Sequence, residues 1–155
     1  MGVRGQSEQV VTTEWDGFVQ ALVRCLAELP SRATLIIAAP GNRYVQFQQF
    51  DIKLSAELTG NYYLTEPISD DAAQRLSDLG WNAPVLQREI ENWRRSLLWP
   101  IPHSALVDLA RSVAIGLHDA LGVGSPEELR ATGWTEASGD LDLSVLGSMA
   151  RRGGG

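Results

Sequence analysis

The sequence predicts an α+β domain in which an antiparallel sheet, a three-stranded meander with further strands, is flanked by helices. Three observations support this prediction. Apolar residues recur at steps of three and four in segments near both ends of the chain, which is typical of amphipathic helices. Between these segments lie short β-branched runs, and turn-forming residues separate them. The 155 residues, 44% of them hydrophobic, provide enough material for one core but hardly for two.

The first predicted helix begins after Thr13, which can cap it, and ends before Pro30. The dozen residues before Thr13 are small and polar, so we expect residues 1–12 to form a flexible N-terminal arm. The apolar stripe of the helix recurs at helical spacing and consists of Trp15, Phe18, Leu22, Leu26 and Leu29.

Two adjacent strands are predicted after this helix. Residues 34–39 form a β-branched run that ends at Pro40, Gly41 and Asn42, and residues 44–49 follow as the second strand. Because only a tight turn separates the two runs, we expect them to pair in antiparallel fashion.

The position of the third strand follows from the alternation of side chains along a strand. Val45 and Phe47 are odd-numbered, whereas the apolar residues between Ile52 and Leu58 are even-numbered. An unbroken strand would place these two sets on opposite faces. A turn or bulge is therefore expected between Gln48 and Asp51.

A second helix is predicted to open at Ser69 and to end at Gly80, with Trp81 folding back on its last turn. The next segment, residues 84–102, fits a helix about as well as an extended stretch. We interpret it as a strand pair or an irregular extension.

The last strongly periodic segment predicts a helix over residues 103–121, bounded by proline before it and glycine after it. A further short helix is expected to start at Ser125 and to end near Gly133. These elements place a single α+β domain at residues 13–134. Residues 135–155 are small, acidic or glycine-rich, so we expect a flexible C-terminal tail with a short turn within residues 141–146.

Charge and hydropathy exclude several classes of function. The formal charge is −6, from 13 basic and 19 acidic residues, which argues against a nucleic-acid partner. The longest apolar run has five residues, far fewer than the roughly 20 needed to cross a bilayer, so we expect no membrane partner and a cytoplasmic location. The single cysteine, Cys25, lies in an apolar helical pattern and is interpreted as a core residue.

Residues that could carry chemistry are few. The chain has two histidines and one cysteine without the spacing of a metal site, so we expect no metal and no cofactor. His103 with Ser104 and Asp108, and His118 with Asp119, are the local candidates for acid–base work. We interpret the first group as a helix start and the second as a helix boundary residue. No catalytic residues are therefore predicted, and the protein is not expected to be an enzyme.

A binding role is favoured by the segment Arg88–Trp99, which brings together Trp93, Arg94, Arg95 and Trp99. Tryptophan and arginine are enriched at the hot spots of protein interfaces, so these four residues are the predicted partner-binding set. The competing interpretation is a tryptophan pair in the core with solvated arginines.

The order of these elements resembles the fold shared by type III secretion chaperones and YbjN-like proteins, and more specifically the TY-Chap family named after both groups. The similarity covers about Trp15 to Leu129. Its motifs are Tyr44, Val45, Gln46 and Phe47; Ala56 and Glu57 with Asn61 and Leu64; Leu79, Gly80 and Trp81 with Pro84; and Asn92 and Trp93. The chain departs from the family at Gln49–Ile52, where a glycine-containing turn would be expected.

The resemblance implies a small, often dimeric, non-enzymatic domain with a type III secretion chaperone-like fold. Such a domain holds a client protein or peptide and keeps it soluble or secretion-competent, and it needs no cofactor. One alternative from another class stays open at this point, a regulatory module that senses a small ligand in a pocket between sheet and helix.

Overall fold

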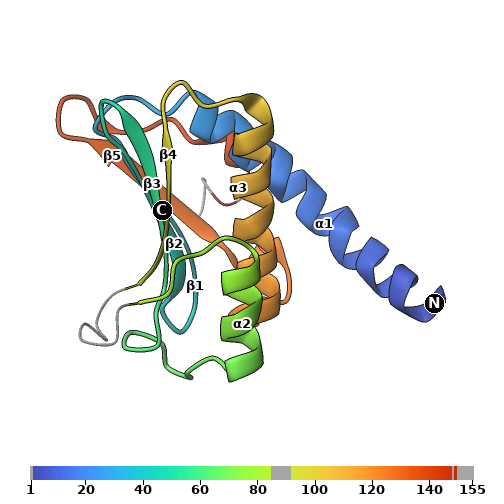
Figure 1. Cartoon of the computed structure of the whole chain (residues 1–155). Helices are drawn as coiled ribbons and strands as arrows, with labels where there is room; N and C mark the ends of the chain where they lie inside the picture. Colours follow the sequence, from blue (N-terminus) through green and yellow to red (C-terminus); the bar gives the residue numbers. More distant parts are fainter. Residues whose placement is uncertain (1, 85–91, 148, 150–155) are drawn as a thin grey trace.

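A six-stranded antiparallel sheet with its helices on one face forms the protein in the computed structural model, which describes residues 2–84, 92–147 and 149 (Figure 1). The strand order is β4-β3-β2-β1-β5-β6, which confirms the predicted α+β class with a meander and further strands. In chain order the elements are α1 (Gly2–Ala27), β1 (Thr34–Ala39), β2 (Arg43–Gln49), β3 (Lys53–Leu58), α2 (Asp70–Asp78), β4 (Trp93–Leu98), α3 (His103–Ile115), a π-helical turn (Gly116–Ala120), a 3₁₀ turn (Pro126–Glu128), β5 (Arg130–Thr135), β6 (Gly139–Asp140) and a second 3₁₀ turn (Ser144–Leu146).

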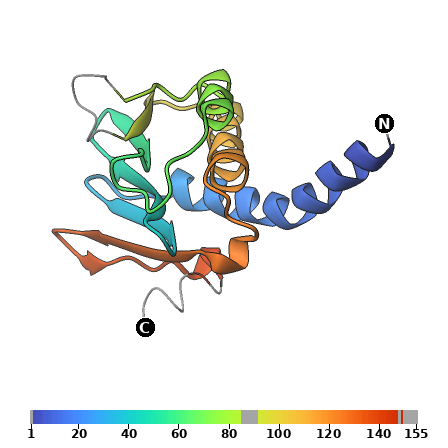
Figure 2. The same cartoon turned by 90° about the horizontal axis from the view of Figure 1, so that it is seen from below.

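Helix α1 packs its predicted apolar stripe into the core, where Trp15, Phe18, Leu22 and Leu26 are buried. The helix begins at Gly2, however, and not after Thr13 as the cap indicated. No proline lies between these two positions, so nothing in the backbone chemistry obliges the helix to start later. Both views show the N-terminal half of α1 extending beyond the sheet and α3 (Figures 1 and 2). The boundary of an independent domain at residue 13 stays a prediction.

The turn predicted from side-chain parity lies between β2 and β3, where the Phe50 N–H donates to the Lys53 carbonyl at 2.8 Å. Odd residues of β2 and even residues of β3 share the buried face, as expected. These side chains are fully buried: Val45, Phe47, Leu54, Ala56 and Leu58. The prediction was wrong only for Ile52, which lies in the turn with 68% of its surface exposed.

The opposite face of the sheet carries no helix among the described elements (Figure 1). Its side chains are mostly polar and partly exposed: Thr34, Gln46, Gln48, Ser55, Glu57 and Thr132. Antiparallel sheets commonly keep one face in water, and this composition fits a solvated face.

Helix α2 has the ends that the sequence predicts. The Ser69 hydroxyl accepts the Ala72 N–H at 3.0 Å, and Gly80 beyond the helix has a φ of +97°, which glycine adopts without strain. Trp81 then folds back: its N–H donates to the Leu76 carbonyl at 3.0 Å, and its indole N–H donates to the Ser112 carbonyl at 3.3 Å. This turn ties α2 to α3.

Within the predicted segment 84–102, residues 93–98 form β4, which pairs with β3; residues 85–91 lie outside the described residues. The helix predicted from Ser125 to Gly133 was wrong beyond Glu128. Ser125 caps only a single 3₁₀ turn, and β5 follows as a partner of β1. Residues two apart lie on nearly opposite sides of a helix, so a helix could not bury Ala131 and Gly133 on one face, whereas the strand buries both against the core.

The ordered core continues past residue 134, where the sequence predicted a flexible tail. β6 forms a hairpin with β5, and the turn predicted within residues 141–146 is the 3₁₀ turn Ser144–Leu146, which packs against α1. Leu143, Leu146 and Met149 are buried. These three residues recur at steps of three, but small and acidic residues surround them, and this composition favoured a flexible tail. Residues 150–155 lie outside the described residues.

Glycine substitutions test the packing of the π-helical turn. A Cβ on Gly116 would lie 3.0 Å from Leu58 Cδ2 and 3.2 Å from Leu76 Cδ2, so Gly116→Ala should lower the free energy of unfolding by about 1–3 kcal/mol through overpacking. Gly17→Ala is the control, because nothing lies within 4 Å of its Cβ position in α1 and alanine should raise stability by about 0.5–1 kcal/mol. Urea unfolding measures both, and a Gly116→Ala protein as stable as wild type would contradict the close packing.

Candidate functional site: the open edge of strand β4

β4 is an edge strand whose backbone is only partly paired on its outer side. At Arg94 the N–H donates to the Asn82 carbonyl at 3.0 Å, and the Arg94 carbonyl accepts the Asn82 N–H at 2.8 Å. Backbone groups of alternate residues in an antiparallel pair point the same way, so the N–H and C=O of Ser96 and Leu98 also point away from β3. Among the described residues, no backbone partner meets these groups.

Apolar side chains surround this open edge. Leu98 is 69% exposed and lies opposite Lys53, while the Trp99 N–H donates to the Ile52 carbonyl at 2.8 Å and so holds the exposed Ile52 beside it. Phe50, in the same turn as Ile52, is also exposed. We call Phe50, Ile52 and Leu98 the edge patch. Exposed apolar groups beside unpaired strand groups are the features that bind extended peptides.

A shallow hollow extends from the edge patch across the end of the sheet. It has a volume of about 610 Å³ and lies between the β2–β3 turn and β5, where Trp134 is 40% exposed. Charges of both signs border it, Arg32, Asp51 and Glu136. The exposed apolar surface at this end of the sheet therefore reaches beyond β4.

Two of the four residues predicted to bind a partner, Trp93 and Arg95, point toward the helices. Trp93 is only 5% exposed and belongs to the core. The Arg95 guanidinium, 14% exposed, donates to the Leu79 carbonyl at 3.2 Å, to the Ser112 hydroxyl at 3.0 Å and to Asp108 at 3.1 Å. Both residues thus fasten β4 to α2 and α3.

The other two, Arg94 and Trp99, lie elsewhere. Arg94 is exposed and faces the helix-free side of the sheet, because side chains alternate along β4. Trp99 is half-buried past the end of β4, and its indole N–H donates to the Gln49 side chain at 2.7 Å. The four residues therefore form no common surface, and partner binding by them stays a prediction.

Asn92 was recognised from the sequence only as part of a family motif, yet it fixes the start of β4. It is 8% exposed; its Oδ1 accepts the Gly60 N–H at 2.9 Å, and its Nδ2 donates to the Tyr44 hydroxyl at 3.1 Å and to Glu57 at 3.2 Å. These bonds tie β4 to the ends of β2 and β3. An asparagine directly before a strand was the available signal.

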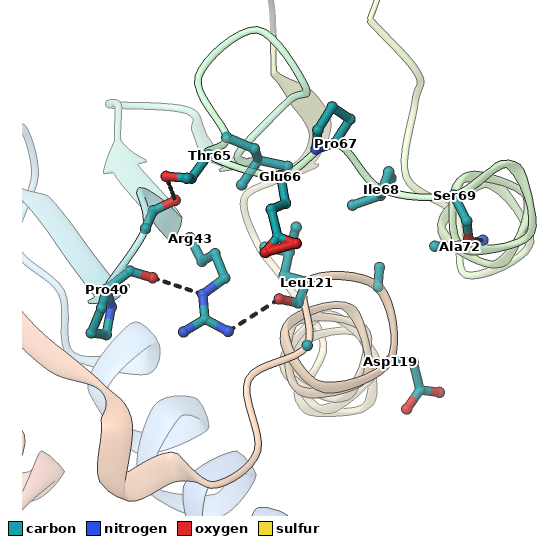
Figure 3. A pocket seen from close by; sticks show the side chains of 14 residues that line it. Pro40, Arg43, Thr65, Glu66, Pro67, Ile68, Ser69, Ala72, Asp119 and Leu121 are labelled. Carbon is teal, nitrogen blue, oxygen red and sulfur yellow. Dashed lines mark hydrogen bonds between the residues drawn. The ribbon is translucent and has the colours of Figure 1, made fainter.

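A separate cleft lies at the other end of the sheet, between the β1–β2 turn, residues 64–69 and the π-helical turn (Figure 3). Its volume is about 640 Å³. Arg43 crosses its base: Nε donates to the Pro40 carbonyl at 2.7 Å, and the two Nη groups donate to the Leu121 carbonyl and to Glu128, each at 3.3 Å. Sequence reasoning recognised only the turn at Gly41 and Asn42, because the cleft is assembled from distant segments.

The groups considered for catalysis form no reactive arrangement within the described part of the chain. Asp108 pairs with Arg95, and His103 and Ser104 occupy the first turn of α3. His118 Nδ1 lies 2.7 Å from Asp119, which also pairs with Arg75 at 3.3 Å. In the described residues, no group of three or more metal-ligating side chains converges.

Cys25 is buried, and burial raises the pKa of its thiol from 9.0 to about 11, with Glu28 adding to the rise. Only the thiolate reacts readily, so a thiol reagent at pH 8 should label native protein slowly and unfolded protein quickly. Because the native pKa lies above the unfolded one, this group's contribution to the free energy of unfolding is full below about pH 9 and is lost as the pH rises toward 11. Labelling of native protein at the rate of unfolded protein would contradict the buried placement.

Substitutions on neighbouring positions of β4 distinguish core from surface. Trp93→Ala should lower the free energy of unfolding by about 3–5 kcal/mol, because it leaves a large cavity. Arg94→Ala should cost less than about 1 kcal/mol, since the side chain is exposed. Thermal and urea unfolding of both variants give the comparison, and equal losses would mean that the strand faces are assigned wrongly.

No helix among the described residues is both long and apolar enough to cross a membrane.

Comparison with known proteins defines the family. Neither the curated proteins nor the solved structures include a significant match. Residues 8–135, more than half of the chain, match the family model described as T3SS (YopN, CesT) and YbjN peptide-binding chaperone 3. Because this match covers most of the chain, the chain belongs to the TY-Chap3 family of peptide-binding chaperones.

Proposed function

We propose that this domain is a non-enzymatic chaperone or adaptor that holds an extended client segment as an additional strand on the outer edge of β4. The observation that carries the proposal is the open backbone at Ser96 and Leu98, which offers two donors and two acceptors to an incoming strand. The family description, peptide-binding chaperone, supports the class of ligand.

The edge patch determines which client sequences bind preferentially. Backbone pairing at an added strand is independent of sequence, whereas pockets and patches for alternate side chains select the peptide. A large apolar residue next to Leu98 and Ile52 would remove their exposed surface from water, at roughly 25 cal/mol per Å² of apolar surface. We therefore expect the client segment to alternate apolar and polar residues.

Several narrower statements extend this proposal. A link to protein secretion and a homodimer are implied by the family resemblance, and a cytoplasmic location was expected from the hydropathy of the sequence; each stays a prediction. Sedimentation at several protein concentrations tests the dimer, and identification of proteins bound to the domain in its native host tests the link to secretion.

Proline at position 96 tests the edge directly. The Ser96 N–H points outward, so Ser96→Pro removes a donor needed by the client without breaking a bond to β3. Binding of a fluorescent peptide of alternating leucine and threonine should weaken about tenfold, the equivalent of one hydrogen bond and the loss of close approach.

Ser96→Ala is the matched control, because it shortens the side chain and keeps the N–H; its affinity should equal that of wild type. Fluorescence anisotropy measures the binding, and circular dichroism confirms that the sheet is intact. If Ser96→Pro binds the peptide as tightly as Ser96→Ala does, the client does not pair with this edge.

A further inference from the structure

The cleft of Figure 3 has walls of two kinds. Its apolar wall consists of Pro40, Leu64, Pro67, Ile68 and Leu121. Carboxylates stand at two places on its rim: Glu66 points from the 64–69 segment into the cleft, and Asp119 lies on the π-helical turn (Figure 3). Apolar surface beside carboxylate acceptors is an arrangement suited to a long side chain with a charged end.

The charges around the cleft favour a cation. Arg43 is the positive group of the lining, but Glu128 neutralises it at 3.3 Å, and their side chains are 23% and 40% exposed. Asp119 is paired with Arg75. Glu66 has no ion-pair partner among the described residues, so no neighbouring cation neutralises its negative charge. An anionic ligand would have to compete with Glu128 for Arg43 and approach Glu66, and both requirements oppose it.

We propose that this cleft is a binding site for a basic side chain, lysine or arginine, carried by a peptide. The aliphatic stem lies along the apolar wall, and the ammonium or guanidinium group meets Glu66. The formal charge of −6 on the whole chain attracts a basic ligand in the same sense.

This site is distinct from the open edge of β4. The ladders from β2 to β4 run from Val45, Leu58 and Trp93 at the end near the cleft to Lys53 and Leu98 at the other end. The statement that the basic side chain belongs to a peptide rests on the proposed function, but the cleft does not use Ser96 or Leu98. Ser96→Pro should therefore leave binding in the cleft unchanged, so failure of one proposal is distinguishable from failure of the other.

The test is a titration of the ¹⁵N-labelled full chain with millimolar N-acetyl-arginine amide, followed by NMR. We expect saturable shifts of the backbone amides of Gly41, Glu66 and Ala120, weakened by added salt. N-acetyl-norleucine amide, which has an aliphatic stem without the charge, should produce no such shifts. Glu66→Gln should weaken binding of the arginine amide by about threefold, as expected for one exposed charge pair.

Glu136→Gln is the matched control, because it removes the same charge on the far end of the sheet and should leave the affinity unchanged. Equal binding of the norleucine amide would show an apolar cleft, and stronger binding of N-acetyl-glutamate amide would show an anion site; either result overturns the proposal. Binding of agmatine without binding of the arginine amide would indicate that the cleft senses free amines. That result would also overturn the proposal, because the ligand would not be part of a peptide. Absence of saturable shifts with the arginine amide would overturn it as well.

Discussion

The alternation of side chains along β4 is the constraint on which the rest of the structure depends. One face of this strand places Trp93, Arg95 and Leu97 toward the helices, and the other presents Arg94, Ser96 and Leu98 to solvent. A register shift of one residue would exchange the two faces and leave a tryptophan in water and a serine in the core. The same alternation directs the backbone groups of Ser96 and Leu98 outward, so the packing of the core and the open edge arise from one register.

Arg95 makes this register specific. Its guanidinium donates to the carbonyl of Leu79 at the C-terminal end of α2 and to two side chains of α3, so two helices fix its position. A mostly buried charge requires such partners, because removing it from water without them is costly. The Ser112 hydroxyl, which accepts from Arg95, in turn donates to the Leu109 carbonyl at 2.7 Å. The edge strand is thereby held on its inner face, which leaves its outer edge available without loosening the fold.

The elements predicted well from sequence are those in which a local pattern and the burial agree. Parity located the β2–β3 turn, because Phe47 and Leu54 must share a face, and the Ser69 cap and Gly80 located both ends of α2. β5 was missed because Pro126, Glu127 and Glu128 form a strong helix start, while the burial of Ala131 and Gly133 depends on pairing with β1, far away in the chain. The cleft was invisible for a similar reason, since Arg43, Glu66 and Asp119 come from separate segments. Residue statistics selected Trp93 as a binding residue, but alternation within β4 already places it on the face of Arg95 and Leu97.

The π-helical turn at the end of α3 has a consequence for how this fold can vary. A π turn accommodates one residue more than the α-helix around it. If the same residues formed a regular α-helix instead, the extra residue would rotate everything that follows by about 100° around the helix axis. The Leu121 carbonyl would then turn away from Arg43, and the floor of the cleft would come apart while the sheet stayed whole. The hydrogen bond between Arg43 and Leu121 at the base of the cleft thus depends on one additional residue in the preceding helix.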